Sequence, residues 1–217
     1  MRQTRGERPH RSRVDDSAST VSVALLRQVH RRFAEEEPRN LFYRAATFLI
    51  ECAHQPSAKL SLAESLAVLL QTWNAQYYRF RGGFRERNFT GLEALLERHA
   101  DTLAVWRGGR LGVDPIDPAR VSTVFTDFEG ELGPVGAAKA LHLLAPSYFP
   151  LWDRAIAAQA YHLTLTSPAA GSYVKLMARV SDEIGACGGW SAFAPGENAV
   201  KLIDELHYCR STLRLPV

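Results

Sequence analysis

The sequence predicts an all-α protein, a helical bundle of two packed subdomains. Apolar residues recur at helical spacing along most of the 217 residues, and no alternation with a period of two continues long enough for a sheet. Capping residues and prolines separate the periodic stretches. The chain is 46% hydrophobic and 23% charged, which is ordinary for a globular protein. We therefore expect one helical domain over residues 20–217.

Three helices are predicted between residues 20 and 77. Each carries apolar side chains at helical spacing, and the third continues through Trp73 to Tyr77. Their ends coincide with residues that start or stop helices: Thr20 or Ser22 and Pro38 for the first, Pro56 and Ser57 for the end of the second, and a capping box of Ser61 and Glu64 for the third.

Six further helices are predicted in the rest of the chain. Gly82 and Gly83 interrupt the pattern before them, and Asp117 followed by Pro118 marks a capped start. The expected ranges are about 90–99, 118–128, 135–144, 153–162, 173–184 and 198–209. Between them we expect a loop over 106–117 and breaks over 130–136, 164–172 and 185–189.

The positive charge of the chain is concentrated at its beginning. Residues 1–13 hold five arginines and one glutamate, which leaves 21 basic and 22 acidic residues for the remainder. A nucleic-acid site on the folded part must therefore be a local patch. Residues 1–19 are predicted to be a disordered basic tail. This tail can add nonspecific attraction to phosphates, or it is a solvated leader with no role.

Several classes of protein are disfavoured. No apolar run approaches the ~18 residues that span a bilayer, and the basic N-terminus lacks the apolar core of a secretory signal. Cys52, Cys187 and Cys209 are too few and too scattered for a disulfide framework, a zinc site or a four-cysteine iron–sulfur cluster. We expect a cytoplasmic monomer with no membrane partner, no metal and no cofactor.

The turn Leu132-Gly133-Pro134-Val135-Gly136 between two predicted helices fits a helix-hairpin-helix at about 119–145. Glycines at Gly133 and Gly136 let such a turn approach a phosphate closely. The second helix then directs its unpaired amides and positive dipole end at that phosphate. Lys139, one turn into this helix, can add a charge-assisted contact. This motif would bind the DNA backbone without recognising the base sequence.

An aspartate at a helix start follows the hairpin, in the segment Pro146–Ile156. This order resembles the helix-hairpin-helix DNA glycosylases, whose turn reads roughly L-P-G-V-G and whose aspartate lies in a V-D-x-x-V/I segment. Asp153 matches that aspartate and Ile156 the apolar residue three positions later. The resemblance implies that Asp153 stabilises an oxocarbenium-like sugar or activates a water. The alternative role for Asp153 is that of an N-cap alone.

The same resemblance bears on Lys139. Family members with an added lyase activity carry a lysine about two residues after the last glycine of the turn. Here the turn reads L-G-P-V-G, Lys139 lies three residues after Gly136, and its separation from Asp153 is shorter than usual. We therefore expect a monofunctional glycosylase in which Lys139 contacts phosphate.

Aromatic, amide and arginine residues alternate over residues 73–85. An enzyme that acts on a base must extrude it into a pocket with a stacking surface and hydrogen-bonding groups. The candidates for this pocket are Trp73, Asn74, Gln76, Tyr77 and, beside Asp153, Trp152. The candidates for contacts to DNA are Arg79, Arg81 and Arg85. The alternative is that the aromatics are core residues and the arginines a solvated face.

Other residues near these segments carry weaker expectations. His142 is expected to be a neutral structural histidine, and His207, Tyr208 and Arg210 can line the edge of the site. Taken together, the sequence predicts hydrolysis of the N-glycosidic bond of a damaged or modified base flipped from DNA. A hypermodified base of phage DNA is one such substrate. The alternatives are a non-catalytic helix-hairpin-helix DNA-binding protein and a helical protein-interaction domain.

Overall fold

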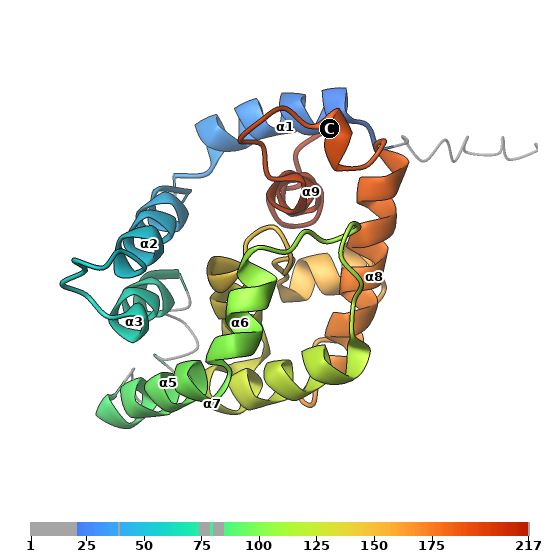
Figure 1. Cartoon of the computed structure of the whole chain (residues 1–217). Helices are drawn as coiled ribbons and strands as arrows, with labels where there is room; N and C mark the ends of the chain where they lie inside the picture. Colours follow the sequence, from blue (N-terminus) through green and yellow to red (C-terminus); the bar gives the residue numbers. More distant parts are fainter. Residues whose placement is uncertain (1–20, 39, 74–78, 80–84, 217) are drawn as a thin grey trace, which may run out of the picture.

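The computed structural model describes residues 21–38, 40–73, 79 and 85–216 (Figure 1). Within these ranges the secondary structure is helical, apart from an isolated bridge between Leu111 and Asp114. The all-α prediction is therefore confirmed. The expectations for the tail over 1–19 concern residues outside this description. None of the described helices is both long and apolar enough to cross a membrane.

The first and third helices begin at their predicted caps. Helix α1 spans Val23–Glu36, and Ser22 Oγ accepts from Leu25 N at 3.3 Å. Helix α2 spans Asn40–Ala53, and α3 spans Leu62–Trp73. The capping box before α3 is formed in both directions, with Ser61 N donating to Glu64 Oε2 at 2.6 Å and Glu64 N donating to Ser61 Oγ at 3.1 Å.

The next two helices depart from the prediction at their ends. Helix α5 spans Glu86–Arg98 and starts before Thr90, because Asn88 Oδ1 accepts from Arg85 N and closes an earlier first turn. Helix α6 spans Ala100–Arg107, so the loop predicted from Trp106 was wrong at its start. Trp106 is buried in α6 and its ring stacks 5.9 Å from that of Tyr148, which fixes this end of the helix in the core.

Helix α7 spans Pro118–Leu144 and begins at the predicted cap, where Asp117 Oδ1 accepts from Ala119 N and Arg120 N. The break predicted over 130–136 was wrong in extent. Gly133 alone leaves the helical conformation, with φ 71° and ψ 168°, and Pro134 follows it. The helix is bent at one residue, and the helix-hairpin-helix expected at about 119–145 stays a prediction.

The last third of the chain contains two π-helical turns. Asp153 precedes η1, which spans Ile156–Ala160 and ends before His162, the predicted end of this helix. Helix α8 (Ala170–Ala186) starts earlier than expected and runs through Gly185. A short 3-10 helix η2 (Trp190–Ala192) leads to α9 (Ala199–Tyr208), and Asn198, the predicted start of this helix, is its N-cap. The chain continues into η3 (Cys209–Leu213).

Both ends of the described chain pack together. Helix α1 lies against α9, α2 against α3, and α7 against both α5 and α8 (Figure 1). The buried apolar side chains form one cluster that includes residues from α1 to α9. Its centre holds the rings of Phe125, Phe149, Trp152 and Tyr173. The predicted division into two subdomains stays a prediction.

Candidate active-site pocket

The connection between α7 and η1 is held by hydrogen bonds from three aromatic or imidazole side chains. His142 Nδ1 lies 2.7 Å from Phe149 O, Tyr173 donates its hydroxyl to Pro150 O at 2.7 Å, and Trp152 Nε1 donates to Pro134 O at 3.1 Å. A carbonyl oxygen can only accept, so Nδ1 is the protonated nitrogen of His142. These bonds fix the backbone that delivers Asp153.

The Asp153 carboxylate is half-buried and has a defined orientation. Its Oδ1 accepts from Ile156 N at 2.8 Å, which is the capping bond expected of an aspartate at a helix start. Its Oδ2 accepts from Thr212 Oγ1 of η3 at 3.3 Å. The same side chain lines a pocket, so capping and exposure to a ligand coexist at this residue.

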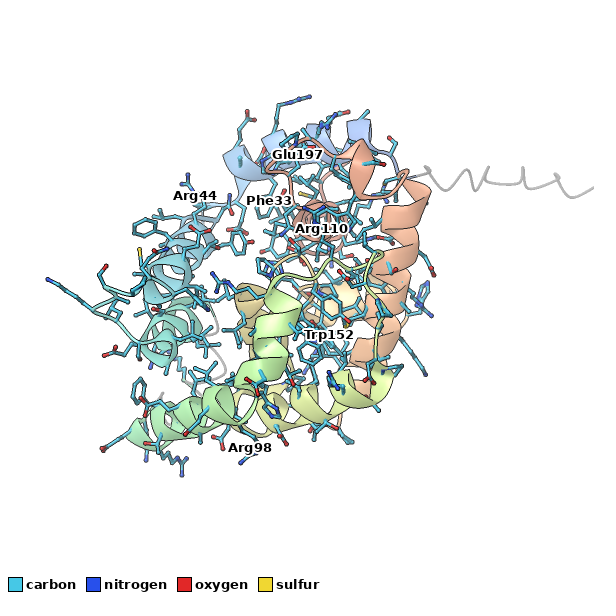
Figure 2. All side chains as sticks on the ribbon, in the orientation of Figure 1. Phe33, Arg44, Arg98, Arg110, Trp152 and Glu197 are labelled. Carbon is cyan, nitrogen blue, oxygen red and sulfur yellow. The ribbon has the colours of Figure 1, made fainter. Side chains whose placement is uncertain are left out.

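The pocket has a volume of about 180 Å³ and lies between α1, α2, α7, α9 and the connection before η1. Its aromatic lining comes from four residues: Phe33, Tyr43, Trp152 and Tyr208. Figure 2 shows Phe33 near the end of α1 and Trp152 near the middle of the molecule. The charged lining comes from three carboxylates and two ammonium groups: Glu37, Asp153, Asp204, Lys139 and Lys201. Apolar walls with a few converging polar groups are typical of ligand sites.

Lys201 is a buried charge in the wall of this pocket, with 8% of its surface exposed. Its Nζ donates to Asp204 Oδ2 at 2.8 Å and lies 3.6 Å from Glu205 Oε1. The same nitrogen lies 4.9 Å from the ring centres of both Phe33 and Tyr43, within the range of cation–π attraction. Burial alone lowers the pKa of Lys201, but the two carboxylates more than offset it and raise that pKa above its ordinary value.

A chain of polar contacts links this wall to the backbone before Asp153. Tyr43 lies with its hydroxyl 3.0 Å from His142 Nε2, and since Nδ1 carries the proton, the hydroxyl donates. Burial lowers the pKa of His142 to about 4, so the imidazole is neutral near pH 7, as expected from the sequence. On the far side of Lys201, Glu205 contacts His30 of α1 at 2.7 Å, and this hydrogen bond raises the pKa of His30.

The structure brings four of the residues expected at the site together. Asp153, Trp152, Lys139 and Tyr208 all line the pocket. Trp152 is almost fully buried, so it forms part of the pocket wall. Gly133 and Gly136 are buried in α7 and do not line the pocket. Their role as contacts to the DNA backbone stays a prediction.

The predicted base-pocket segment is mostly outside the description. Asn74, Gln76, Tyr77 and Arg81 are not among the described residues, and of Trp73 only the backbone, at the end of α3, is described. Arg79 and Arg85 are exposed. Of the three residues expected at the edge near the C-terminus, Tyr208 lines the pocket, whereas His207 contacts Glu183 of α8.

Sequence reasoning missed Phe33, Tyr43, Lys201 and Asp204 as pocket residues. Phe33 belongs to the buried apolar side of α1, so its helical spacing indicates a core residue and gives no sign that it also lines the pocket. Lys201 and Asp204 are spaced i, i+3 and look like an ordinary surface pair on α9. The available signal was that Lys201 interrupts an apolar run of Ala199, Val200, Leu202 and Ile203.

Comparison with known proteins gave no match to a family model, a curated protein or a solved structure. Any functional assignment must therefore come from the residues and their geometry. Within the described ranges, no group of three or more histidine, cysteine, aspartate or glutamate side chains is arranged to hold a metal ion.

Proposed function

We propose that the protein is a monofunctional DNA glycosylase that hydrolyses the N-glycosidic bond of a damaged or modified base flipped from DNA. The observation that carries the proposal is the placement of Asp153 in a pocket with aromatic walls beside Lys139. The order of these two residues in the sequence is the one that resembles the helix-hairpin-helix glycosylases.

The geometry at Asp153 suits a carboxylate that acts on a sugar. Two donors, Ile156 N and Thr212 Oγ1, fix its two oxygens, so the charge is oriented before a ligand arrives. Cleavage of a glycosidic bond develops positive charge on the sugar, which a nearby carboxylate stabilises. The same carboxylate can take a proton from the water whose oxygen bonds to C1′ as the base leaves.

The remaining lining suits an extruded base. Flipped bases are held by aromatic or apolar surfaces and by hydrogen bonds to their edges. Phe33, Tyr43 and Tyr208 supply the first, and Asn40, Lys201 and Asp204 are available for the second. Lys139, which lines the pocket, and the exposed Arg79 and Arg85 are proposed to contact the DNA backbone.

The test is release of a base from oligonucleotides that each carry one modified base, detected as strand scission after alkali. We expect scission on at least one substrate with the wild-type chain, in single- or double-stranded form. Asp153→Asn is expected to lower the rate by about 10²–10⁴-fold, the usual size of a lost acid–base group. Asparagine caps a helix as well as aspartate does, so the variant should keep its fold.

The matched control is Asp117→Asn, which also changes an N-cap aspartate but lies at the start of α7, outside the pocket lining. This control should leave the rate unchanged. An active Asp153→Asn variant would contradict the proposal, and so would the absence of scission on every substrate. DNA binding without scission would favour the non-catalytic alternative, and a borohydride-trapped adduct would contradict the monofunctional assignment.

A further inference from the structure

Burying the charged side chain of Lys201 costs free energy. Removing an ammonium from water costs several kcal/mol unless it is paired and fully hydrogen-bonded. An ammonium has three N–H donors. Within the described part of the chain its one hydrogen-bond acceptor is Asp204 Oδ2, since Glu205 Oε1 at 3.6 Å is an ion-pair contact without a hydrogen bond. The Lys201 side chain is about nine-tenths buried, and its remaining N–H donors are available to a ligand in the pocket.

Asp204 is the complementary half of this arrangement. It lines the same pocket, and its side chain is 9% exposed. Its Oδ2 accepts from Lys201, and Oδ1 has no hydrogen-bond donor among the described residues. The pair therefore offers a donor beside an acceptor. A heterocycle with a carbonyl oxygen next to a ring N–H matches that edge.

The size of the pocket limits the ligand. A cavity of about 150 Å³ holds one benzene ring. The volume of about 180 Å³ exceeds this by about one water molecule's share of space. One six-membered ring with its carbonyl oxygens fits this volume. A fused second ring exceeds it.

We propose that the pocket is specific for a single-ring pyrimidine base, with Lys201 donating to a ring carbonyl oxygen and Asp204 accepting from the neighbouring ring N–H. This inference rests on the proposed function and narrows its substrate to modified pyrimidines of the uracil type. Purines are excluded by size. Phe33 and Tyr43 hold the Lys201 ammonium against their ring faces and so fix the donor in place.

The test uses free bases, so it requires no catalysis. Binding of uracil, unsubstituted pyrimidine and hypoxanthine to the full chain is measured by saturation-transfer NMR and titration. Pyrimidine keeps the single ring but has neither a carbonyl oxygen nor a ring N–H. Hypoxanthine keeps a carbonyl next to an N–H but adds a second ring. We expect uracil to bind at least tenfold more tightly than either.

Lys201→Met is expected to weaken uracil binding at least tenfold. The matched control is Lys175→Met on the exposed surface of α8, which should bind as the wild type does. Because Lys201→Met leaves two buried carboxylates without their counter-charge, its fold is checked by circular dichroism. The comparison of the three bases on the wild-type chain decides the proposal even where this variant unfolds.

Equal binding of hypoxanthine or pyrimidine, or no binding of uracil, would overturn the proposal. A folded Lys201→Met variant with unchanged uracil affinity would also overturn it. Failure of the proposed function is distinguishable from failure of this inference. If only the proposed function fails, uracil still binds through Lys201 although no oligonucleotide is cleaved. In the reverse case, the protein excises a purine and binds no pyrimidine. That result would support the glycosylase proposal and contradict the proposed specificity for pyrimidines.

Discussion

His142 connects the wall of the pocket to the backbone that carries Asp153. It accepts from the Tyr43 hydroxyl and donates to Phe149 O, and both bonds require the neutral imidazole with its proton on Nδ1. Protonation of Nε2 would turn the acceptor for Tyr43 into a donor. Since Tyr43 lines the pocket, the charge state of this buried histidine affects the shape of the site as well as stability.

The pKa of His142 predicts a pH-dependent stability. Its pKa is lowered from 6.5 to about 4 in the folded chain. Between these values the unfolded chain binds a proton that the folded chain does not, so the contribution is complete above pH 6.5 and is lost as the pH falls toward 4. We expect the free energy of unfolding to fall by about 2 kcal/mol from this group between pH 7.5 and 5.

Urea denaturation of the wild type and of His142→Gln at the two pH values isolates this effect. The variant should be less stable at pH 7.5, and the difference between the two proteins should shrink at pH 5. His30 has the opposite sign, because its contact with Glu205 raises its pKa and its contribution is lost as the pH rises. His30 is present in both proteins and cancels. A difference that stays constant with pH would refute the assignment.

The sequence identified some pocket residues and could not identify others, for a physical reason. Asp153 and Lys139 lie near each other in the chain, so a local pattern was enough to select them. Phe33 and Lys201 come from α1 and α9, and their meeting depends on how the two ends of the chain pack. A lysine paired with carboxylates at i, i+3 and i, i+4 has the same local pattern on a surface and in a buried wall.

At the scale of elements, the most predictable feature was a helix start with a capping side chain. Ser22, Ser61, Asp117 and Asn198 cap the helices that their sequence positions indicated. These bonds are local, between residues at most three positions apart, so no tertiary information is needed. The end of helix α6 was missed because it depends on the packing of Trp106 in the core, which no local pattern reveals. The extent of α7 was missed because Gly130, expected to begin a break, lies within the helix.

Alanine substitutions at two glycines of the bent helix α7 are expected to change the free energy of unfolding in opposite directions. Gly133 has φ 71° and ψ 168°, a region open essentially to glycine, so Gly133→Ala should destabilise the protein by about 1–3 kcal/mol. Gly130 is helical and exposed, and a Cβ there would meet open space. Gly130→Ala should therefore stabilise the protein by about 0.5–1 kcal/mol.

Thermal and urea unfolding of the two alanine variants measure these changes. The pair is matched, since both substitutions add one methyl group to the same helix. If Gly133→Ala proved as harmless as Gly130→Ala, the helix would not be bent at that residue. The position of Trp152 and Asp153 at the pocket would then need another explanation, because Trp152 Nε1 donates to Pro134 O immediately after the bend.

At the scale of the whole molecule, the pocket closes only when the ends of the described chain meet. Arg27 of α1 contacts Glu197 before α9 at 2.7 Å, and the Arg27 hydrogen bond is the main reason that the pKa of Glu197 is lowered to about 2. Leu26, Val29 and Phe33 bury the facing side of α1. A site assembled from residues more than 150 positions apart is visible in the fold and not in any short motif.

The distribution of charge over the molecule bears on how it would approach DNA. Beyond residue 13 the chain has 21 basic and 22 acidic residues, so its net charge does not attract a polyanion. Five arginines lie within residues 1–13. If these contact phosphates, replacing all five by glutamine should weaken binding to an undamaged duplex and reduce the salt slope of log K by up to about 4.5, at about 0.9 for each contact.

The measurement is fluorescence anisotropy of a labelled duplex over a range of salt concentrations, with the wild type and the five-glutamine variant. Excision by the variant at low salt should be retained, because no pocket residue is altered. The matched control replaces Arg98 and Arg120, which are exposed on α5 and α7 and contact Asp127 and Asp117. Their charges are already compensated, so the salt slope should stay the same. An unchanged slope in the five-glutamine variant would show that residues 1–13 are a solvated leader, and attraction to DNA would then have to come from a local patch around the pocket.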